Sequence, residues 1–414
     1  MLVLEQKKRT NASIILAIIV TFVSNDTLLF GTNANRTFFW LHIGILLASA
    51  IYMLFHVQYI GKNALVYALF MIAAMMLTQG VNLDSQYMKY AYNAIIVVIC
   101  VLFSSYVRKE IFYKVFVSAV YIIALFAIIA FLLQTMAPSV VSLFPIVTNK
   151  IGNEFGFYGL GIVQLSNLGS IPRAYGFFRE PGVFAVFLVL SLIIQLFFLK
   201  QFKVRHVVVT AITAILTFST AAYIVVPLVL TSYFIKQIFE TKNRHRRVWI
   251  LALVLLFAVV FVFFSIGPER IFSLVFNKLS VDNSSRDSRF GAIPANFNIF
   301  LQNPVFGKGW DYVEKNFAYF ASLGTYAGAH NTNTMFKFLA IYGIGPFICI
   351  ACAIFAFFRK SCKSVLWALA LTLVWFVILS NEDMTVNVVF YLLPFYAFEK
   401  EEKRREPTLE NIIN

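Results

Sequence analysis

Long apolar stretches recur along the whole chain and limit its possible folds more than any other feature. About twelve of them are long enough, or nearly so, to cross roughly 30 Å of hydrocarbon. Of the 414 residues, 60% are hydrophobic and only 13% are charged, which is more apolar than a soluble core requires. We therefore expect an all-α, polytopic helical membrane protein with about 12 transmembrane helices, forming one bundle over residues 1–414. The stretches cover residues 13–30, 37–55, 63–80, 90–107, 111–134, 178–199, 206–219, 221–239, 248–266, 334–357, 364–380 and 384–398.

Basic residues fall on alternate connections between these stretches. By the positive-inside rule such connections face the cytoplasm, so we expect both termini on the cytoplasmic side. Because this distribution accounts for the net charge of +15, we expect no nucleic acid partner. The basic connections carry Lys7-Lys8-Arg9, Lys62, Arg108-Lys109, Lys200 with Lys203 and Arg205, Lys236 with Lys242, Arg244, Arg246 and Arg247, Arg359-Lys360 with Lys363, and Lys400 with Lys403-Arg404-Arg405.

Two long connections face the opposite side in this scheme, over residues 135–177 and 267–333. Neither is large enough for an ordinary independent enzyme domain, and both exceed the usual length of a connection between helices. Their many aromatic residues argue against disorder. We expect both to lie on the outer face of the bundle and to contribute to function.

The second connection contains a short predicted amphipathic helix at residues 286–302. Ser285 is a suitable N-cap, and residues 303–304, Asn-Pro, end the helical pattern. Arg286 and Arg289 are three residues apart, so they share a face of this helix.

The remainder of this connection holds two further features. Gly307 and Gly309 form a GxG pattern, which is weak evidence for phosphate binding, and a turn is the favoured interpretation. Residues 331–333, Asn-Thr-Asn, can cap the helix that follows. This places His330 at a helix N-terminus on the outer surface.

Arginines on the outward connections oppose the positive-inside rule and therefore call for another explanation. An interfacial anchor explains Arg36, and the cap of a span end explains Arg270. For the other four, the functional hypothesis is convergence on an anionic ligand at the outer leaflet, since the planar guanidinium matches phosphate geometry. These four are Arg173, Arg179, Arg286 and Arg289.

Arg179 and Glu180 lie at a predicted helix start. Pro181 suits the first helical position, and the apolar run from there to Leu199 is about long enough to span the membrane. A helix N-terminus carries partial positive charge and unpaired N–H groups, which favour anions. The structural alternative is a simple salt bridge of Arg179 with Glu180 or with another loop.

Other chemistries have little support in the sequence. The outward acids form no pair or cluster at ligand spacing, so we expect neither a metal nor a cofactor. There is no nucleophilic serine elbow and no phosphate-binding loop for ATP. His330 is the only histidine on an outward connection; capping or packing is its structural alternative. The outward acids that form no metal-binding cluster are Asp282, Asp287, Asp311 and Glu314.

Three motifs together resemble the O-antigen polymerase and ligase superfamily over residues 173–346. The first is RAYGFFREPG at the start of a middle span, and the second is SRFGAIPANFNIFLQNPVFGKGW. The third is AHNTNTMFKFLAIYGIGP. Their order within a chain of about twelve spans carries the resemblance, and the REPG wording is more similar to polymerases than to ligases.

The resemblance implies a metal-independent membrane glycosyltransferase of the bacterial inner membrane with its active site facing the periplasm. Its donor would be an oligosaccharide on undecaprenyl diphosphate within the membrane lipid, and a chain-length regulator protein is a further expected partner. Arg179 and Arg289 match the arginines expected to hold the diphosphate, with Arg173 and Arg286 near them. His330 matches the histidine expected near the acceptor hydroxyl, and Glu180 is the alternative base.

Two rivals to the polymerase remain open. A ligase of the same superfamily would transfer the finished glycan to lipid A core. A transporter or flippase for lipid-linked glycans should carry charged residues along the inner faces of its spans, whereas these spans are almost free of charge.

Overall fold

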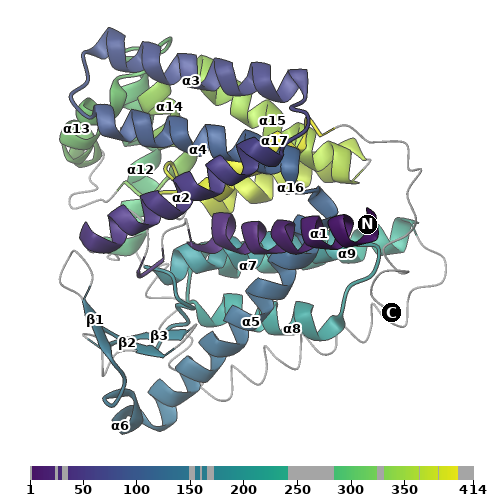
Figure 1. Ribbon diagram of the computed structural model, residues 1–414. Helices are drawn as coiled ribbons and strands as arrows, with labels where there is room; N and C mark the ends of the chain where they lie inside the picture. The colour runs from purple at the N-terminus through teal and green to yellow at the C-terminus, as the bar shows by residue number, and fades with distance from the viewer. Residues whose placement is uncertain are drawn as a thin grey trace.

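The protein is a bundle of helices in which several run side by side (Figure 1). The computed structural model describes residues 2–23, 27–29, 36–148, 154–158, 161–165, 172–240, 284–323, 331–362, 364–380 and 382–399. Seven helices in this described part are long and apolar enough to cross a membrane. The expectation of a polytopic helical membrane protein is confirmed. The count of about twelve spans and their orientation stay predictions, and the stretch 248–266 lies outside the described residues.

The first part of the chain forms five helices. The bounds of the second to the fifth agree with the predicted stretches to within a few residues, because each begins and ends where the apolar run gives way to charged or turn-forming residues. The first differs from the predicted stretch 13–30, because it begins at Leu2 and its π-helical continuation ends at Val23. The five helices are α1 (Leu2–Ile18) with its π-helical continuation η1 (Ile19–Val23), α2 (Arg36–His56), α3 (Lys62–Asn82), α4 (Tyr87–Tyr106) and α5 (Lys109–Met136).

A small sheet follows α5 and was not predicted. The helix α6 (Pro138–Val141) leads into three antiparallel strands, β1 (Ile146–Thr148), β2 (Glu154–Tyr158) and β3 (Gly161–Gln164). In register, Val147 opposes Phe155 and Phe157 opposes Ile162. Phe155 and Ile162 pack against Tyr175, so the sheet buries part of the segment that enters the next helix.

The central helix of the bundle is α7 (Pro181–Ile193), continued by η3 (Ile194–Phe198). Of its spanning window, 94% is buried, against at most 56% for the other six candidate spans. Such a helix can be apolar all round because it faces protein on every side. It packs against α8 (Val204–Leu216) and α9 (Thr220–Glu240). Pro181 occupies the first turn, as predicted.

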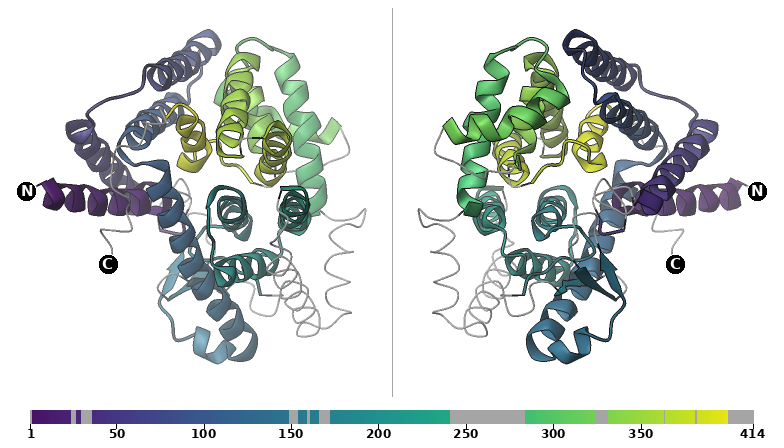
Figure 2. Two further views of the ribbon diagram at one scale, coloured as in Figure 1. Left: turned by 90° about the vertical axis from the view of Figure 1, so that its right-hand side faces the viewer. Right: turned by 90° about the vertical axis from the view of Figure 1, so that its left-hand side faces the viewer.

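The remaining helices come from the second long connection and the C-terminal part. They are α12 (Ser284–Leu301), α13 (Gly309–Leu323), α14 (Thr334–Tyr342), α15 (Ile344–Cys362), α16 (Val365–Leu379) and α17 (Val388–Tyr396). The predicted helix 286–302 is confirmed as α12, whereas α13 was not predicted. Figure 2 shows the C-terminal helices as one group beside α5 to α9, and α16 packs on both α7 and α9.

The predicted span 334–357 is wrong as a single helix. It is divided into α14 and α15 at Gly343, whose φ of +79° lies in the region that favours glycine. A Cβ at this position would meet the carbonyl of Val305 and would lie 2.8 Å from the amide nitrogen of Gly307. The break therefore lets the chain before α13 cross the α14–α15 junction in backbone contact.

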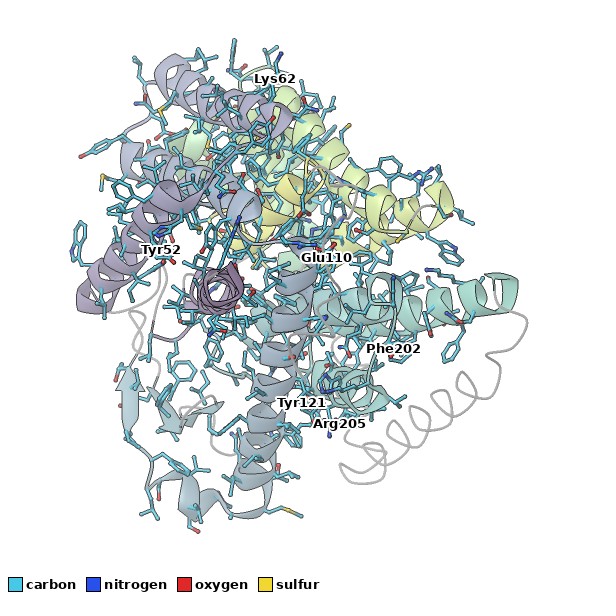
Figure 3. The ribbon with its side chains drawn as sticks, turned by 45° about the vertical axis from the view of Figure 1, so that its right-hand side comes forward. Tyr52, Lys62, Glu110, Tyr121, Phe202 and Arg205 are labelled. Atoms are coloured by element: carbon cyan, nitrogen blue, oxygen red, sulfur yellow. The ribbon has the colours of Figure 1, made fainter. Side chains whose placement is uncertain are left out.

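Elements of the two long connections lie on one side of the molecule. In Figure 1, α6, the sheet, α12 and α13 are all on the left. Figure 3 brings the right-hand side forward and shows Lys62, Glu110 and Arg205, which lie near the starts of α3, α5 and α8. In the described part of the chain, the starts of α3, α5 and α8 thus lie away from α6, the sheet, α12 and α13.

Candidate active site

Arg179 and Glu180 stand at the start of α7, as the sequence predicts. Glu180 is the N-cap residue, but its side chain does not bond to the helix N–H groups. Instead, Nη1 of Arg179 donates to Oε1 of Glu180 at 2.8 Å. The side chain of Arg179 is only 13% exposed, whereas that of Glu180 is 48% exposed. The salt bridge considered as the structural alternative is therefore present.

A second acidic contact to Arg179 comes from the turn between α16 and α17. Nη2 of Arg179 donates to the carbonyl oxygen of Asp383 at 3.4 Å and lies 3.9 Å from Oε2 of Glu382. The Glu382 side chain is 6% exposed. The guanidinium is thus held between its neighbour Glu180 and a turn some 200 residues further along the chain.

Asp383 forms an ion pair with Lys337 of α14. Nζ of Lys337 lies 2.6 Å from Oδ2 of Asp383, and the Lys337 side chain is 7% exposed. The other carboxylate oxygen accepts hydrogen bonds from the amide and the hydroxyl of Thr385. Burial alone raises the pKa of Asp383, but Lys337 and the Thr385 donors outweigh it and leave the pKa below its usual value.

The first turn of α14 is also bonded to this turn through Thr334. Its hydroxyl donates to the carbonyl oxygen of Glu382 at 2.5 Å and accepts from the amide of Met384 at 2.9 Å. One residue earlier, Asn333 caps α14 by accepting from the amide of Phe336 at 3.0 Å. The predicted cap is confirmed, and the start of α14 is fixed against residues 382–384.

An amide pair connects α14 to α12. Nδ2 of Asn296 donates to Oδ1 of Asn331 at 2.8 Å, and Nδ2 of Asn331 donates back to Oδ1 of Asn296 at 3.0 Å. Asn296 is fully buried in α12. Asn331 precedes Thr334 by three residues, so the backbone joins this amide pair to the contacts of α14 with the turn at 382–383 and with Arg179.

Two predicted site segments lie next to these contacts in the chain. Arg286 and Arg289 lie in the N-terminal part of α12, and His330 directly precedes Asn331 but lies outside the described residues. The roles assigned to these three residues stay predictions. Arg270 also lies outside the described part of the chain.

Arg173 has a separate anchor. Its Nε donates to the carbonyl oxygen of Thr217 at 3.0 Å, between α8 and α9. Burial raises the pKa of the nearby Tyr175 hydroxyl. The charge of Arg173 lowers this pKa, and the charge of Glu180 raises it. Tyr175 is thus within electrostatic reach of both charges, although no contact joins Arg173 to Arg179 in the described hydrogen bonds.

The GxG pattern is a turn, as favoured from the sequence. Gly307 and Gly309 have φ values of +69° and +75°. The N-terminus of α13 that follows already receives a carboxylate, because Oδ2 of Asp84 accepts from the amide of Asp311 at 3.1 Å. A Cβ on Gly309 would collide with this carboxylate. The glycines allow close packing here, and the Asp84 carboxylate occupies the place that a phosphate would need.

Sequence reasoning missed Lys337, Glu382 and Asp383. Lys337 lies within the predicted span 334–357, and the sequence analysis assigned no role to the two acids. The available signal was a lysine inside an apolar stretch, because an ionisable residue there requires a partner. The acidic pair in SNEDMT, between two adjacent apolar stretches, was the matching partner.

Comparison with known proteins gives one match. A family model described as O-antigen ligase matches residues 206–351, from the start of α8 into α15. This confirms the resemblance to the O-antigen polymerase and ligase superfamily and supports a glycosyltransferase-like enzyme in that pathway. Arg179, Glu382 and Asp383 lie outside the matched range. No curated protein and no solved structure matches the chain.

Proposed function

We propose that this chain, which carries an O-antigen ligase family region at residues 206–351, is a surface polysaccharide polymerase. It transfers glycan from undecaprenyl diphosphate to a hydroxyl of another lipid-linked repeat unit at the periplasmic face of the inner membrane. The observation that carries this proposal is the position of Arg179. A largely buried guanidinium stands at the N-terminus of the central helix, on the side of both long connections.

Arg179 can stabilise the negative charge of a diphosphate leaving group. During transfer, the acceptor oxygen bonds to the anomeric carbon, and the bond from this carbon to the phosphate oxygen breaks. The electron pair remains on the diphosphate, so negative charge grows there. A charge-assisted hydrogen bond contributes about 1.5–3 kcal/mol, and a preorganised donor in a dry site contributes more to the transition state. The N–H groups that begin α7 add partial positive charge beside it.

The proton of the acceptor hydroxyl goes to a base. We assign this task to His330, because a neutral imidazole near pH 7 accepts a proton efficiently; such catalysis typically contributes about 10²–10⁴ in rate. Glu180 is the alternative base. Its carboxylate is half exposed and lies beside Arg179.

The donor must compete with carboxylates for Arg179. Glu180 is the displaceable partner, because an exposed ion pair contributes little to stability. The contacts to residues 382–383 are more buried and can remain while Glu180 moves aside. Arg289 and Arg286 on α12 are the proposed further ligands of the diphosphate.

A ligase is the second candidate, favoured by the description of the matching family model. Its acceptor would be lipid A core in place of a second repeat unit. The REPG stretch at residues 179–182, which is more similar to polymerases, favours the first candidate.

The test uses the purified protein in lipid vesicles with undecaprenyl-diphosphate-linked repeat units, with and without lipid A core. A ladder of products in the absence of lipid A core supports the polymerase. Products that form only with lipid A core support the ligase. Absence of product in both arms contradicts both functions.

A further inference from the structure

We infer that the turn at Glu382 and Asp383 positions the guanidinium of Arg179 for the donor diphosphate, and that Lys337 holds this turn in place. This inference rests on the proposed function. It assigns positioning roles to three residues that do not themselves touch the substrate, and two of the three lie outside the family match.

The contacts of Arg179 define the geometry. Its Nη1 is directed to Glu180, while Nη2 is directed to the Asp383 carbonyl at 3.4 Å and to Glu382 at 3.9 Å. A guanidinium binds phosphate through two parallel N–H groups, so its plane must be fixed before the ligand arrives. The turn contacts Nη2, whereas the more exposed Glu180 contacts Nη1, so the turn can hold this plane when Glu180 is displaced.

The turn at residues 382–384 is held by contacts from two side chains of α14. Lys337 and Thr334 are three residues apart, so they share one face of α14. Lys337 binds the Asp383 carboxylate, and Thr334 binds the backbone on both sides of Asp383. Lys337 also lies 4.8 Å from the ring centroid of the buried Trp310, which restricts the ammonium group from a second direction.

The charge balance distinguishes positioning from direct binding. Asp383 carries a negative charge that Lys337 matches, and Glu382 brings another negative charge toward Arg179. Neither acid can attract a diphosphate. Lys337 is buried and committed to Asp383, so it is not the group that a lipid-linked donor meets first. Glu382 and Asp383 therefore position the Arg179 guanidinium and do not bind the diphosphate themselves.

The test is a double-mutant cycle between positions 179 and 382, measured as the Kd for undecaprenyl diphosphate and as kcat/KM for the lipid-linked donor. Glu382→Gln keeps the shape of the side chain and removes its charge. We expect this change to weaken product binding and to lower kcat/KM by about 10–100-fold, as a small misplacement of a positioning group does. In an Arg179→Lys background, the same change should have almost no further effect, since the fork that it positions is absent.

Glu314→Gln is the matched control. Glu314 pairs with Lys89 on the same side of the molecule, and no described contact joins it to Arg179. This variant should behave as the wild type in both backgrounds. Thermal unfolding of each variant in detergent checks that the fold is intact.

A second pair of variants tests the role of Lys337. Lys337→Met leaves the Asp383 carboxylate buried without its cation and should lower kcat/KM. Adding Asp383→Asn removes the stranded charge and should recover part of the loss, because a neutral buried pair is tolerated far better than a broken ionic one.

Three results would overturn the inference. One is equal losses from Glu382→Gln in the wild-type and Arg179→Lys backgrounds. Another is tighter binding of undecaprenyl diphosphate by Glu382→Gln, which would make Glu382 a competitor of the ligand. The third is unchanged binding and turnover. If the wild-type protein forms no product from the donor in either acceptor arm, the proposed function fails instead, and the two failures are thereby separated.

Discussion

At the scale of a single residue, the proposed binding of the diphosphate depends on the shape of the Arg179 side chain as well as its charge. Arg179→Lys keeps the charge but loses the planar fork. We expect kcat to fall by about 10²–10³, as for loss of one preorganised donor. The measurement is polymer length and initial rate with the reconstituted protein. Arg205→Lys, at the opposite end of the bundle (Figure 3), is the control and should leave both unchanged. Wild-type polymer from Arg179→Lys would remove the diphosphate role.

His330 provides a second prediction at the residue scale. His330→Ala should stop transfer while leaving binding of the lipid-linked donor measurable, because the base acts on the acceptor. Donor binding and product formation are measured on the same preparation. Normal turnover by His330→Ala would show that His330 is not the base. Glu180→Gln would then be the variant expected to lose the reaction.

The residues of the site were predictable to an unequal extent. Arg179 and Glu180 stood out because topology disfavours charge at that position and Pro181 marks a helix start. Lys337 could be noticed as a lysine inside an apolar stretch, but its pairing with Asp383 could not be predicted, because 46 residues separate the two. Their meaning arises only when α14 and the α16–α17 turn come together.

At the scale of an element, Gly343 is a position that a side chain cannot occupy without strain. Its positive φ and the close approach of the 305–307 backbone leave no space for a Cβ. We expect Gly343→Ala to destabilise the protein by about 1–3 kcal/mol or more through backbone strain. Gly345→Ala is the control, since a Cβ there meets nothing within 4 Å and an alanine favours the helix. Thermal unfolding in detergent compares the two, and equal unfolding temperatures would contradict this interpretation of the junction.

The pair of Lys337 and Asp383 makes stability depend on pH. Because the pKa of Asp383 is lowered in the folded protein, its charge stabilises the fold above the unfolded pKa of about 4. This contribution is lost as the pH falls through the lower, folded pKa. At pH about 7, Asp383→Asn should cost about 3–5 kcal/mol, because it leaves a buried lysine without its partner.

The corresponding measurement is thermal unfolding of wild type and Asp383→Asn from pH about 7 to about 3. The difference between them should shrink as the pH falls below the unfolded pKa of about 4, because the wild type then loses the contribution of the Asp383 charge. Asp311→Asn, which breaks an exposed pair with Lys315, should show a much smaller difference at every pH. A gap between wild type and Asp383→Asn that is independent of pH would rule out the ion pair as the cause.

Elements were predictable where local signals agree with the global fold. The start of α7 follows from Pro181, and the helix 286–302 follows from its apolar pattern and the Asn-Pro after it. The predicted N-cap Ser285 is wrong, because α12 begins at Ser284 and includes it. The division of 334–357 was missed because the residues on both sides of Gly343 are apolar, and hydropathy does not register a backbone turn. The β1–β3 sheet and α13 were missed because their partners are distant residues such as Tyr175 and Asp84.

At the scale of the whole molecule, the bundle brings together segments that are remote in the chain. The start of α7, the start of α14 and the α16–α17 turn meet at one point, and α12 is joined to them by the Asn296–Asn331 pair. The membrane composition and bundle class could be read from the sequence. The meeting point could not, because it results from helix packing and not from any local pattern.

The stoichiometry of the reconstituted reaction without lipid A core tests the proposed polymerase function and the role of Arg179 together. We expect the wild-type protein to convert lipid-linked repeat units into a ladder spaced by one unit, and to release one undecaprenyl diphosphate for each new linkage. Arg179→Lys should slow the ladder and the release together, by about 10²–10³. Polymer without matching release of undecaprenyl diphosphate, or an undiminished ladder from Arg179→Lys, would contradict the account.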